Sequence, residues 1–255
     1  MDPAQHAAAV LEETAVLRAA VGGADLSAPV PSCPGWTLTD LLRHVGSVQR
    51  WFSVLLRRRV PERPTSRQVD LQLPDTSEGL PGWLADGSAG AAEVFAATDP
   101  DAPMWAWGLD QHARFWIRRM LFETLVHRVD AELALGLTPA IDPARAADGI
   151  DEFLTNLPFA ESFAPGTAEL RGHGEVIRFC CPEQGAGADW RVQLRPDGFG
   201  LLPVDDRAPG ATTEVRARAA DLLLFLYGRL PAADTALQVS GDRAVLAVWT
   251  AHSAF

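Results

Sequence analysis

The chain of 255 residues contains no lysine, because all 22 of its basic residues are arginine. A lysine Schiff base, a lysine anchor for pyridoxal phosphate and a phosphate-loop lysine are therefore excluded. Cysteine is scarce as well. Cys33, Cys180 and Cys181 form no C-x-x-C pair, which excludes the common cysteine zinc site and a thioredoxin-like redox motif. Three thiols without a disulfide framework are typical of a reducing compartment.

Long apolar runs and an excess of positive charge are also missing. The longest apolar runs, such as "LLLFLYG", are far shorter than a membrane span. The first 21 residues carry acidic groups and helical periodicity instead of the regions of a signal peptide, so we expect a soluble cytoplasmic protein that does not bind membranes. The net charge of −11 and the lack of a basic stripe argue against nucleic acid as a partner.

The spacing of apolar residues predicts helices in the first part of the chain and strands in the second. The expected helices cover residues 3–21, 37–58, 80–98, 112–136, 143–157, 219–230 and a final stretch from Asp242. The expected strands are short, and lie at residues 167–172, 175–182, 189–196, 198–204, 213–218 and 236–241. Polar loops are expected at 59–78 and 99–111. We therefore predict a four-helix bundle over residues 1–158, followed by a small α+β domain over residues 159–255.

The helix expected at 37–58 begins with a capping signal and carries a histidine. Thr37 is a good N-cap, and Asp40 three residues later suits a capping box. His44 lies at the edge of the apolar stripe, where it is either a functional group or a half-buried core histidine. Cys33 precedes a Pro-Gly turn and has no base beside it in the sequence. We therefore interpret Cys33 as a small apolar group that packs at the start of the helix.

The helix expected at 112–136 has two distinct faces, an apolar core stripe and a second row that also carries polar residues. Its core stripe contains Phe115, Phe122, Val126, Val129 and Leu133. Its second row contains Trp116, Met120, Glu123, His127 and Asp130. Glu123 and His127 are four residues apart, so their Cβ atoms lie about 5–6 Å from each other and could hold one cation. A buried Glu–His hydrogen bond is the alternative, because about one such pair is expected by chance.

Other catalytic patterns are weak. The sequence has no G-x-S-x-G elbow and no G-x-G-x-x-G fingerprint after a strand. Trp105 and Trp107 either line the mouth of a pocket or plug the end of the bundle. The remaining histidines are assigned to the surface without partners, and they are His6, His112, His173 and His252.

Four segments resemble one known family. "VPSCPGWTLTDLLRHVG" and "FWIRRMLFETLVHRVDAELALG" resemble the mycothiol-dependent maleylpyruvate isomerase family of the DinB-like metalloenzyme superfamily. "ADLLLFLYGRL" with "LQVSGDRAVLAVW" resembles that family's C-terminal domain, a small sterol-carrier-like module. The resemblance implies a DinB-like bundle in which His44, Glu123 and His127 bind a divalent metal ion. Asp130, one turn further along the helix, is either a hydrogen-bond acceptor for a metal-bound histidine or a surface charge.

This ligand set leaves coordination positions open, as catalysis requires. Zinc is the first expectation, and nickel, iron, manganese or cobalt would accept the same set. The resemblance further implies mycothiol as a cosubstrate and a small electrophile or unsaturated acid as substrate. Cis-trans isomerisation and thiol S-transfer both remain open, as do a metal-dependent hydrolase and a non-catalytic small-molecule-binding protein. Arg119 and Arg50 could meet a substrate carboxylate or be solvated, and the oligomeric state is open.

Overall fold

The computed structural model describes residues 1–64, 69–185, 188–203 and 209–253, and the chain divides into two compact units. The first unit is Met1–Pro139 and the second is Ala140–Phe255. The boundary expected after residue 158 therefore differs from this division. The helix α5 (Pro143–Asn156) accounts for the difference, because it packs against α6 (Ala219–Leu226) and strand β3 (Gly198–Leu201) of the second unit. Periodicity identifies such a helix but not its packing partner.

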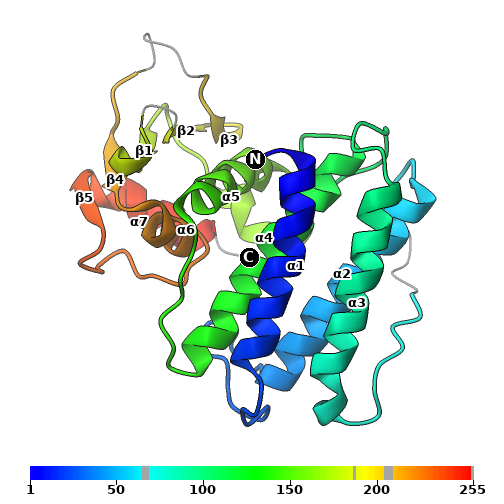
Figure 1. Ribbon diagram of the computed structural model, residues 1–255. Helices are drawn as coiled ribbons and strands as arrows, with labels where there is room; N and C mark the ends of the chain where they lie inside the picture. The colour runs from blue at the N-terminus through cyan, green and yellow to red at the C-terminus, as the bar shows by residue number, and fades with distance from the viewer. Residues whose placement is uncertain (65–68, 186–187, 204–208, 254–255) are drawn as a thin grey trace. The chain divides into compact units, whose positions relative to one another are not determined.

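Four long helices form the first unit, as expected (Figure 1). They are α1 (Pro3–Ala20), α2 (Leu38–Arg58), α3 (Leu80–Ala97) and α4 (Ala113–Ala134). The helix α1 packs against α3 and α4, and α2 packs against the same two helices. The order around the bundle is therefore α1, α3, α2, α4. This order places one face of α2 directly against α4, which is the arrangement that the candidate site needs.

The start of α2 is fixed by the predicted capping box. The Asp40 backbone N–H donates to Thr37 Oγ1 at 3.3 Å, and the Thr37 backbone N–H donates to Asp40 Oδ2 at 2.9 Å. These bonds satisfy donors that have no partner inside the first turn of a helix. The register of α2, and hence the direction of His44, is set at this cap.

The helices α2 and α3 approach closely at a glycine. A Cβ atom on Gly46 would lie 2.1 Å from the Trp83 ring, so no larger residue fits there. The Arg50 guanidinium lies 4.0 Å from the centre of the same ring and donates to the Trp83 carbonyl at 2.8 Å. Arg50 therefore holds α2 and α3 together, which gives it a structural role in place of the possible contact with a substrate carboxylate.

The loop before α4 closes one end of the bundle with aromatic side chains. The Trp116 Nε1–H donates to the Trp105 carbonyl at 2.7 Å, and the two rings lie 5.4 Å apart. Trp107 makes an edge-to-face contact with Phe115 at 5.2 Å. These contacts favour the interpretation that the two loop tryptophans plug the end of the bundle.

Leu133 was expected in the core stripe of α4 but is 38% exposed, because the stripe ends one turn before the helix does.

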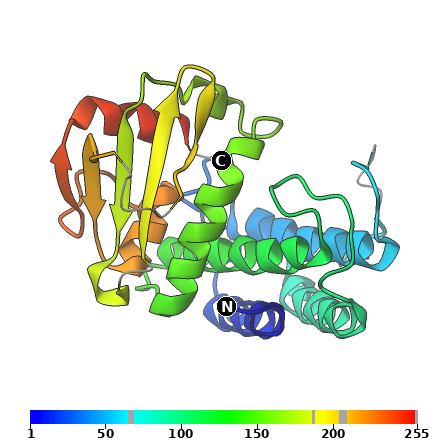
Figure 2. The same cartoon turned by 90° about the horizontal axis from the view of Figure 1, so that it is seen from above.

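The second unit contains a five-stranded sheet with strand order β3-β2-β1-β4-β5 (Figure 2). The other strands are β1 (Val176–Cys180), β2 (Asp189–Arg195), β4 (Thr213–Arg216) and β5 (Gln238–Gly241). All neighbouring pairs are antiparallel except β1 with β4. Phe179 contacts Phe225 of α6 and Trp249 of α7 (Arg243–His252), so both helices cover one face of the sheet.

Two expectations for this unit need comment. The strand expected at 167–172 is wrong, because Pro165–Glu169 forms a 3-10 helix. Pro165 and Gly166 favour a turn there, and the segment lacks the alternation of a strand. Residue 204 of the strand expected at 198–204 lies outside the described residues, as do residues 65–68 of the loop expected at 59–78.

The two neighbouring cysteines of the second unit, Cys180 and Cys181, are buried. Burial raises the pKa of both thiols, that of Cys181 to about 12.

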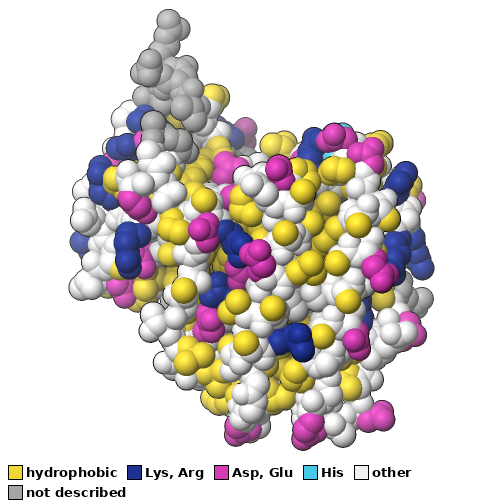
Figure 3. All heavy atoms as spheres, viewed as in Figure 1, with side chains coloured by type: hydrophobic (Ala, Val, Ile, Leu, Met, Phe, Trp, Pro, Cys, Tyr) yellow, Lys and Arg dark blue, Asp and Glu magenta, His cyan; other side chains and the backbone are white. Residues whose placement is uncertain are grey.

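The surface carries both signs of charge. On the face drawn in Figure 3, acidic and basic side chains are interspersed, and the basic ones form no continuous patch. Among the described residues, no helix combines the length and the apolar character that crossing a membrane requires.

Candidate metal centre

A tight turn before α2 contributes two side chains to the site. The Trp36 backbone N–H donates to the Cys33 carbonyl at 3.0 Å, Pro34 follows Cys33, and Gly35 has a φ of 84°. Proline at the second position and a positive φ at the third are the requirements of a type II turn. The turn brings the Trp36 ring within 4.9 Å of the His44 ring and 6.0 Å of the His127 ring. Two histidines from different helices therefore share one aromatic neighbour.

The three predicted ligands converge between α2 and α4. His44 Nε2 lies 2.9 Å from Glu123 Oε1, and His127 Nε2 lies 3.4 Å from the same oxygen. One ligand atom from each residue lies within 4.8 Å of the others. The side chains are partly accessible, with 32% of His44 and 21% of Glu123 exposed. Sequence spacing predicted the Glu123–His127 pair, and the bundle brings His44 to it across 79 residues of chain.

The second oxygen of Glu123 has a different partner. Arg119 Nη2 donates to Glu123 Oε2 at 2.8 Å, and Arg119 is only 3% exposed. Arg119 is therefore neither a solvated surface charge nor an open contact for a substrate carboxylate. It fixes the direction of the carboxylate and leaves Oε1 facing the two histidines.

Hydrogen bonds and neighbouring charges favour the ionised form of Glu123 and the protonated form of His127. Burial alone would raise the pKa of Glu123, but hydrogen bonds to His127 and His44, with the Arg119 charge, hold it well below its usual range. Burial alone would lower the pKa of His127. Hydrogen bonds to Asp130, Cys33 and Glu123 outweigh this effect and hold the pKa well above its usual range. These directions favour a protonated His127 imidazole beside an ionised Glu123 carboxylate, so a cation must compete with that proton.

We expect the affinity of this site for Mn²⁺ to rise with pH. The ordinary pKa of histidine is 6.5 and that of His127 lies well above it, so metal binding near neutral pH must release the His127 proton. Affinity should therefore increase until the pH passes the pKa of His127. Calorimetric titration in two buffers with different ionisation enthalpies measures the released protons. An affinity that is constant between about pH 6 and pH 8 would contradict this assignment.

Asp130 and Cys33 lie on the other side of the His127 ring. Asp130 Oδ2 is 2.9 Å from His127 Nδ1, and Asp130 is fully buried, so it is not the surface charge that was the alternative. The Cys33 thiol donates to the same oxygen at 3.4 Å. Cys33 packs against the hydrophobic core beside α2, as expected of a small apolar group, and the turn in addition carries its thiol to a buried carboxylate on another helix. The Pro-Gly signal was visible in the sequence, but the helix that it faces was not.

The donor set fits a divalent transition metal. Two imidazole nitrogens and one carboxylate oxygen suit zinc, iron, cobalt or nickel, and leave positions for further ligands. A carboxylate that orients the ligand histidine through its other nitrogen is common at such centres. His44, Glu123 and His127 are therefore the residues that would hold the ion, with Asp130 orienting His127.

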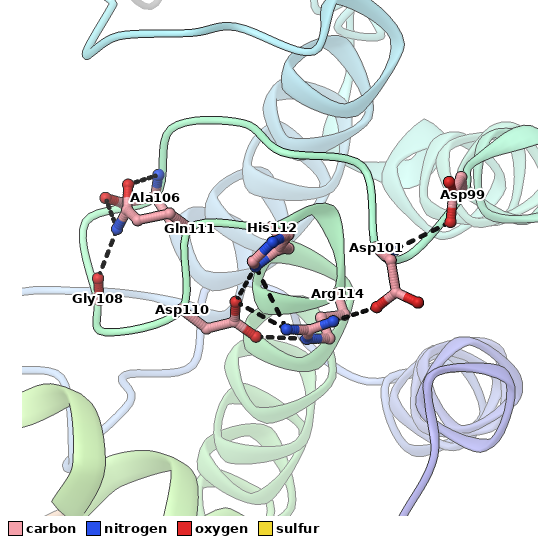
Figure 4. Close-up of polar contacts among 8 residues, drawn as sticks. All are labelled: Asp99, Asp101, Ala106, Gly108, Asp110, Gln111, His112 and Arg114. Atoms are coloured by element: carbon pink, nitrogen blue, oxygen red, sulfur yellow. Dashed lines mark hydrogen bonds and ion pairs between the residues drawn. The ribbon is translucent and has the colours of Figure 1, made fainter.

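A second histidine–carboxylate cluster lies at the start of α4 (Figure 4). His112 Nδ1 is 2.6 Å from Asp110 Oδ1, and Arg114 Nε donates to Asp110 Oδ2 at 2.6 Å. Arg114 also pairs with Asp101. His112 was assigned to the surface without a partner; its side chain is 38% exposed, but it has a partner, because the loop folds back on the first turn of the helix. The cluster holds the loop against the helix. It contains a single imidazole, so a variant of His112 serves as a control for variants of the candidate metal ligands.

Comparisons with known proteins agree with this architecture. The family model described as "Mycothiol maleylpyruvate isomerase N-terminal domain" matches residues 7–132, and "MDMPI C-terminal domain" matches residues 144–247. No curated protein sequence matches the chain. Crystal structures of the mycothiol-dependent maleylpyruvate isomerase and of a histidine-to-alanine mutant of it each share the fold, with a TM-score of 0.64, 14% identity and 95% coverage of both chains. The chain therefore belongs to the mycothiol maleylpyruvate isomerase family.

Proposed function

We propose that this protein is a divalent-metal-dependent enzyme that uses mycothiol to isomerise a small cis-unsaturated acid. The observation that carries the proposal is the convergence of His44 Nε2, Glu123 Oε1 and His127 Nε2 in a chain of this family. The fold alone does not determine the reaction, because one fold supports many activities. The ligand set provides the chemical argument.

The residues of the site have separate tasks. His44, Glu123 and His127 would hold a divalent ion, whose positive charge would lower the pKa of a coordinated thiol. Arg119 holds Glu123 Oε2, which keeps Oε1 directed at the histidines. Asp130 holds Nδ1 of His127, which keeps Nε2 directed at the same point. The Trp36 ring packs beside both imidazole rings.

In the proposed reaction the thiolate of the cosubstrate adds to the carbon–carbon double bond of the acid. The former double bond is then a single bond and can rotate. Elimination of the thiolate restores the double bond in the trans form, so the thiol is regenerated. S-transfer would begin with the same thiolate but would leave it attached to an electrophile. The two reactions therefore differ in whether thiol is consumed.

The test is a paired assay of the full chain with mycothiol. Maleylpyruvate and a small electrophile are supplied in separate reactions, each with and without a chelator. Turnover of maleylpyruvate without loss of thiol, abolished by the chelator, is the expected result. Loss of thiol with the electrophile alone would replace isomerisation by S-transfer. Absence of turnover with metal-loaded protein in both reactions would overturn the proposal and reopen the hydrolase and binding-protein alternatives.

A further inference from the structure

We propose that Cys33, His127 and Asp130 form a second cation site, selective for thiophilic metal ions such as Cd²⁺, and that its occupation excludes metal from the His44–Glu123–His127 site. Binding of an ion at the second site does not depend on the proposed reaction. The exclusion rests on the proposed metal site, because the two sites share the His127 ring.

The three ligand atoms of the second site are already close together. Asp130 Oδ2 lies 2.9 Å from His127 Nδ1 and 3.4 Å from Cys33 Sγ. One ligand atom from each of the three residues lies within 4.8 Å of the others. Around a tetrahedral zinc ion, such atoms are about 3.3–3.6 Å apart. The cluster therefore needs only small side-chain shifts to bind an ion.

The chemistry of this cluster differs from that of the first. A thiolate, an imidazole and a carboxylate favour cadmium, zinc and copper over manganese or magnesium, because thiolate is a soft ligand. Binding replaces two protons, one from the Cys33 thiol and one from Nδ1 of His127, and both pass to solvent. Asp130 is buried and already shares its oxygen with both groups, so the ion takes the place of these hydrogens.

The two sites compete for one imidazole. A neutral imidazole has one nitrogen with a lone pair and one N–H, so it can bind one ion through one nitrogen. An ion on Nδ1 leaves the proton on Nε2, which points at Glu123 Oε1 at 3.4 Å. That N–H donates to the carboxylate and removes a ligand from the first site. Occupation of the second site therefore prevents metal binding at the first site.

Cadmium titration of the chelator-stripped full chain tests this inference. Thiolate-to-cadmium charge-transfer absorption reports Cys33, because the other two thiols are buried in the second unit. We expect the band to appear in the wild type and in His44→Ala, and to saturate at one equivalent. We expect at least a tenfold loss of the band in Cys33→Ser and in Cys33→Ala. Prior binding of Mn²⁺ should raise the cadmium concentration at half-saturation in the wild type but not in His44→Ala.

Each other outcome overturns the inference. A band that persists in both Cys33 variants assigns the absorption to Cys180 or Cys181. A band that is lost in His44→Ala makes Cys33 an additional ligand of the first site. A wild type without a band has no second site, and simultaneous binding of manganese and cadmium disproves the exclusion. These readouts do not require turnover, so failure of the proposed reaction leaves the cadmium result interpretable.

Discussion

Replacing His44 by alanine should abolish Mn²⁺ binding and thiol-dependent turnover together while the protein stays folded. His44 supplies one of the three converging ligand atoms, and its side chain is 32% exposed, so its removal opens no core cavity. Loss of a supporting residue at a metal centre costs about 10–100-fold in affinity, and we expect loss of a ligand to exceed that range. Elemental analysis and calorimetry with Mn²⁺ measure metal binding, and the mycothiol assay measures turnover. Manganese is the appropriate probe because it disfavours the thiolate cluster.

Two variants calibrate this result. His112→Ala removes a partly exposed imidazole that also faces a carboxylate, and it should leave Mn²⁺ binding unchanged. Asp130→Asn keeps the shape of a buried side chain but removes the charge that orients His127, so an intermediate loss of about 10–100-fold is expected. Retention of wild-type affinity by His44→Ala would refute the assignment of the site. Equal losses in His44→Ala and His112→Ala would indicate a general effect on the bundle.

Sequence alone predicted the local features of the site. The capping box at Thr37 and Asp40 and the spacing of Glu123 and His127 depend on residues within one turn of a helix. His44 was assigned from a family resemblance, because its partner lies 79 residues away and periodicity cannot show that two helices face each other at one level. The bundle architecture followed from helix count and loop length, and the structure confirms it.

The missed features depend on contacts between distant segments. The pairing of Arg119 with Glu123 has helical spacing, but the sequence did not show that Arg119 is buried against this carboxylate and so unavailable to a substrate. Cys33 and Trp36 reach α4 through a turn whose type was visible but whose direction was not. The assignment of α5 to the second unit depends on its packing against α6. Each case requires the arrangement of elements, which local propensity does not contain.

The largest expected effect on stability comes from Arg128, which joins α1 to α4. Its Nε donates to Glu13 Oε2 at 2.8 Å, and its Nη1 donates to Glu132 Oε2 at 2.5 Å. Arg128 is 2% exposed and Glu13 is 4% exposed. Arg128→Met would leave buried carboxylates without their cation, and removing one partner of such a group costs about 3–5 kcal/mol. Urea unfolding of the full chain measures the change in the free energy of unfolding.

Arg114→Met is the matched control on the same helix. Arg114 also pairs with two carboxylates, Asp110 and Asp101, but its side chain is 38% exposed, so its loss should cost less than about 1 kcal/mol. Equal losses of stability in the two variants would contradict a larger contribution from the buried Arg128 pairs than from the exposed Arg114 pairs.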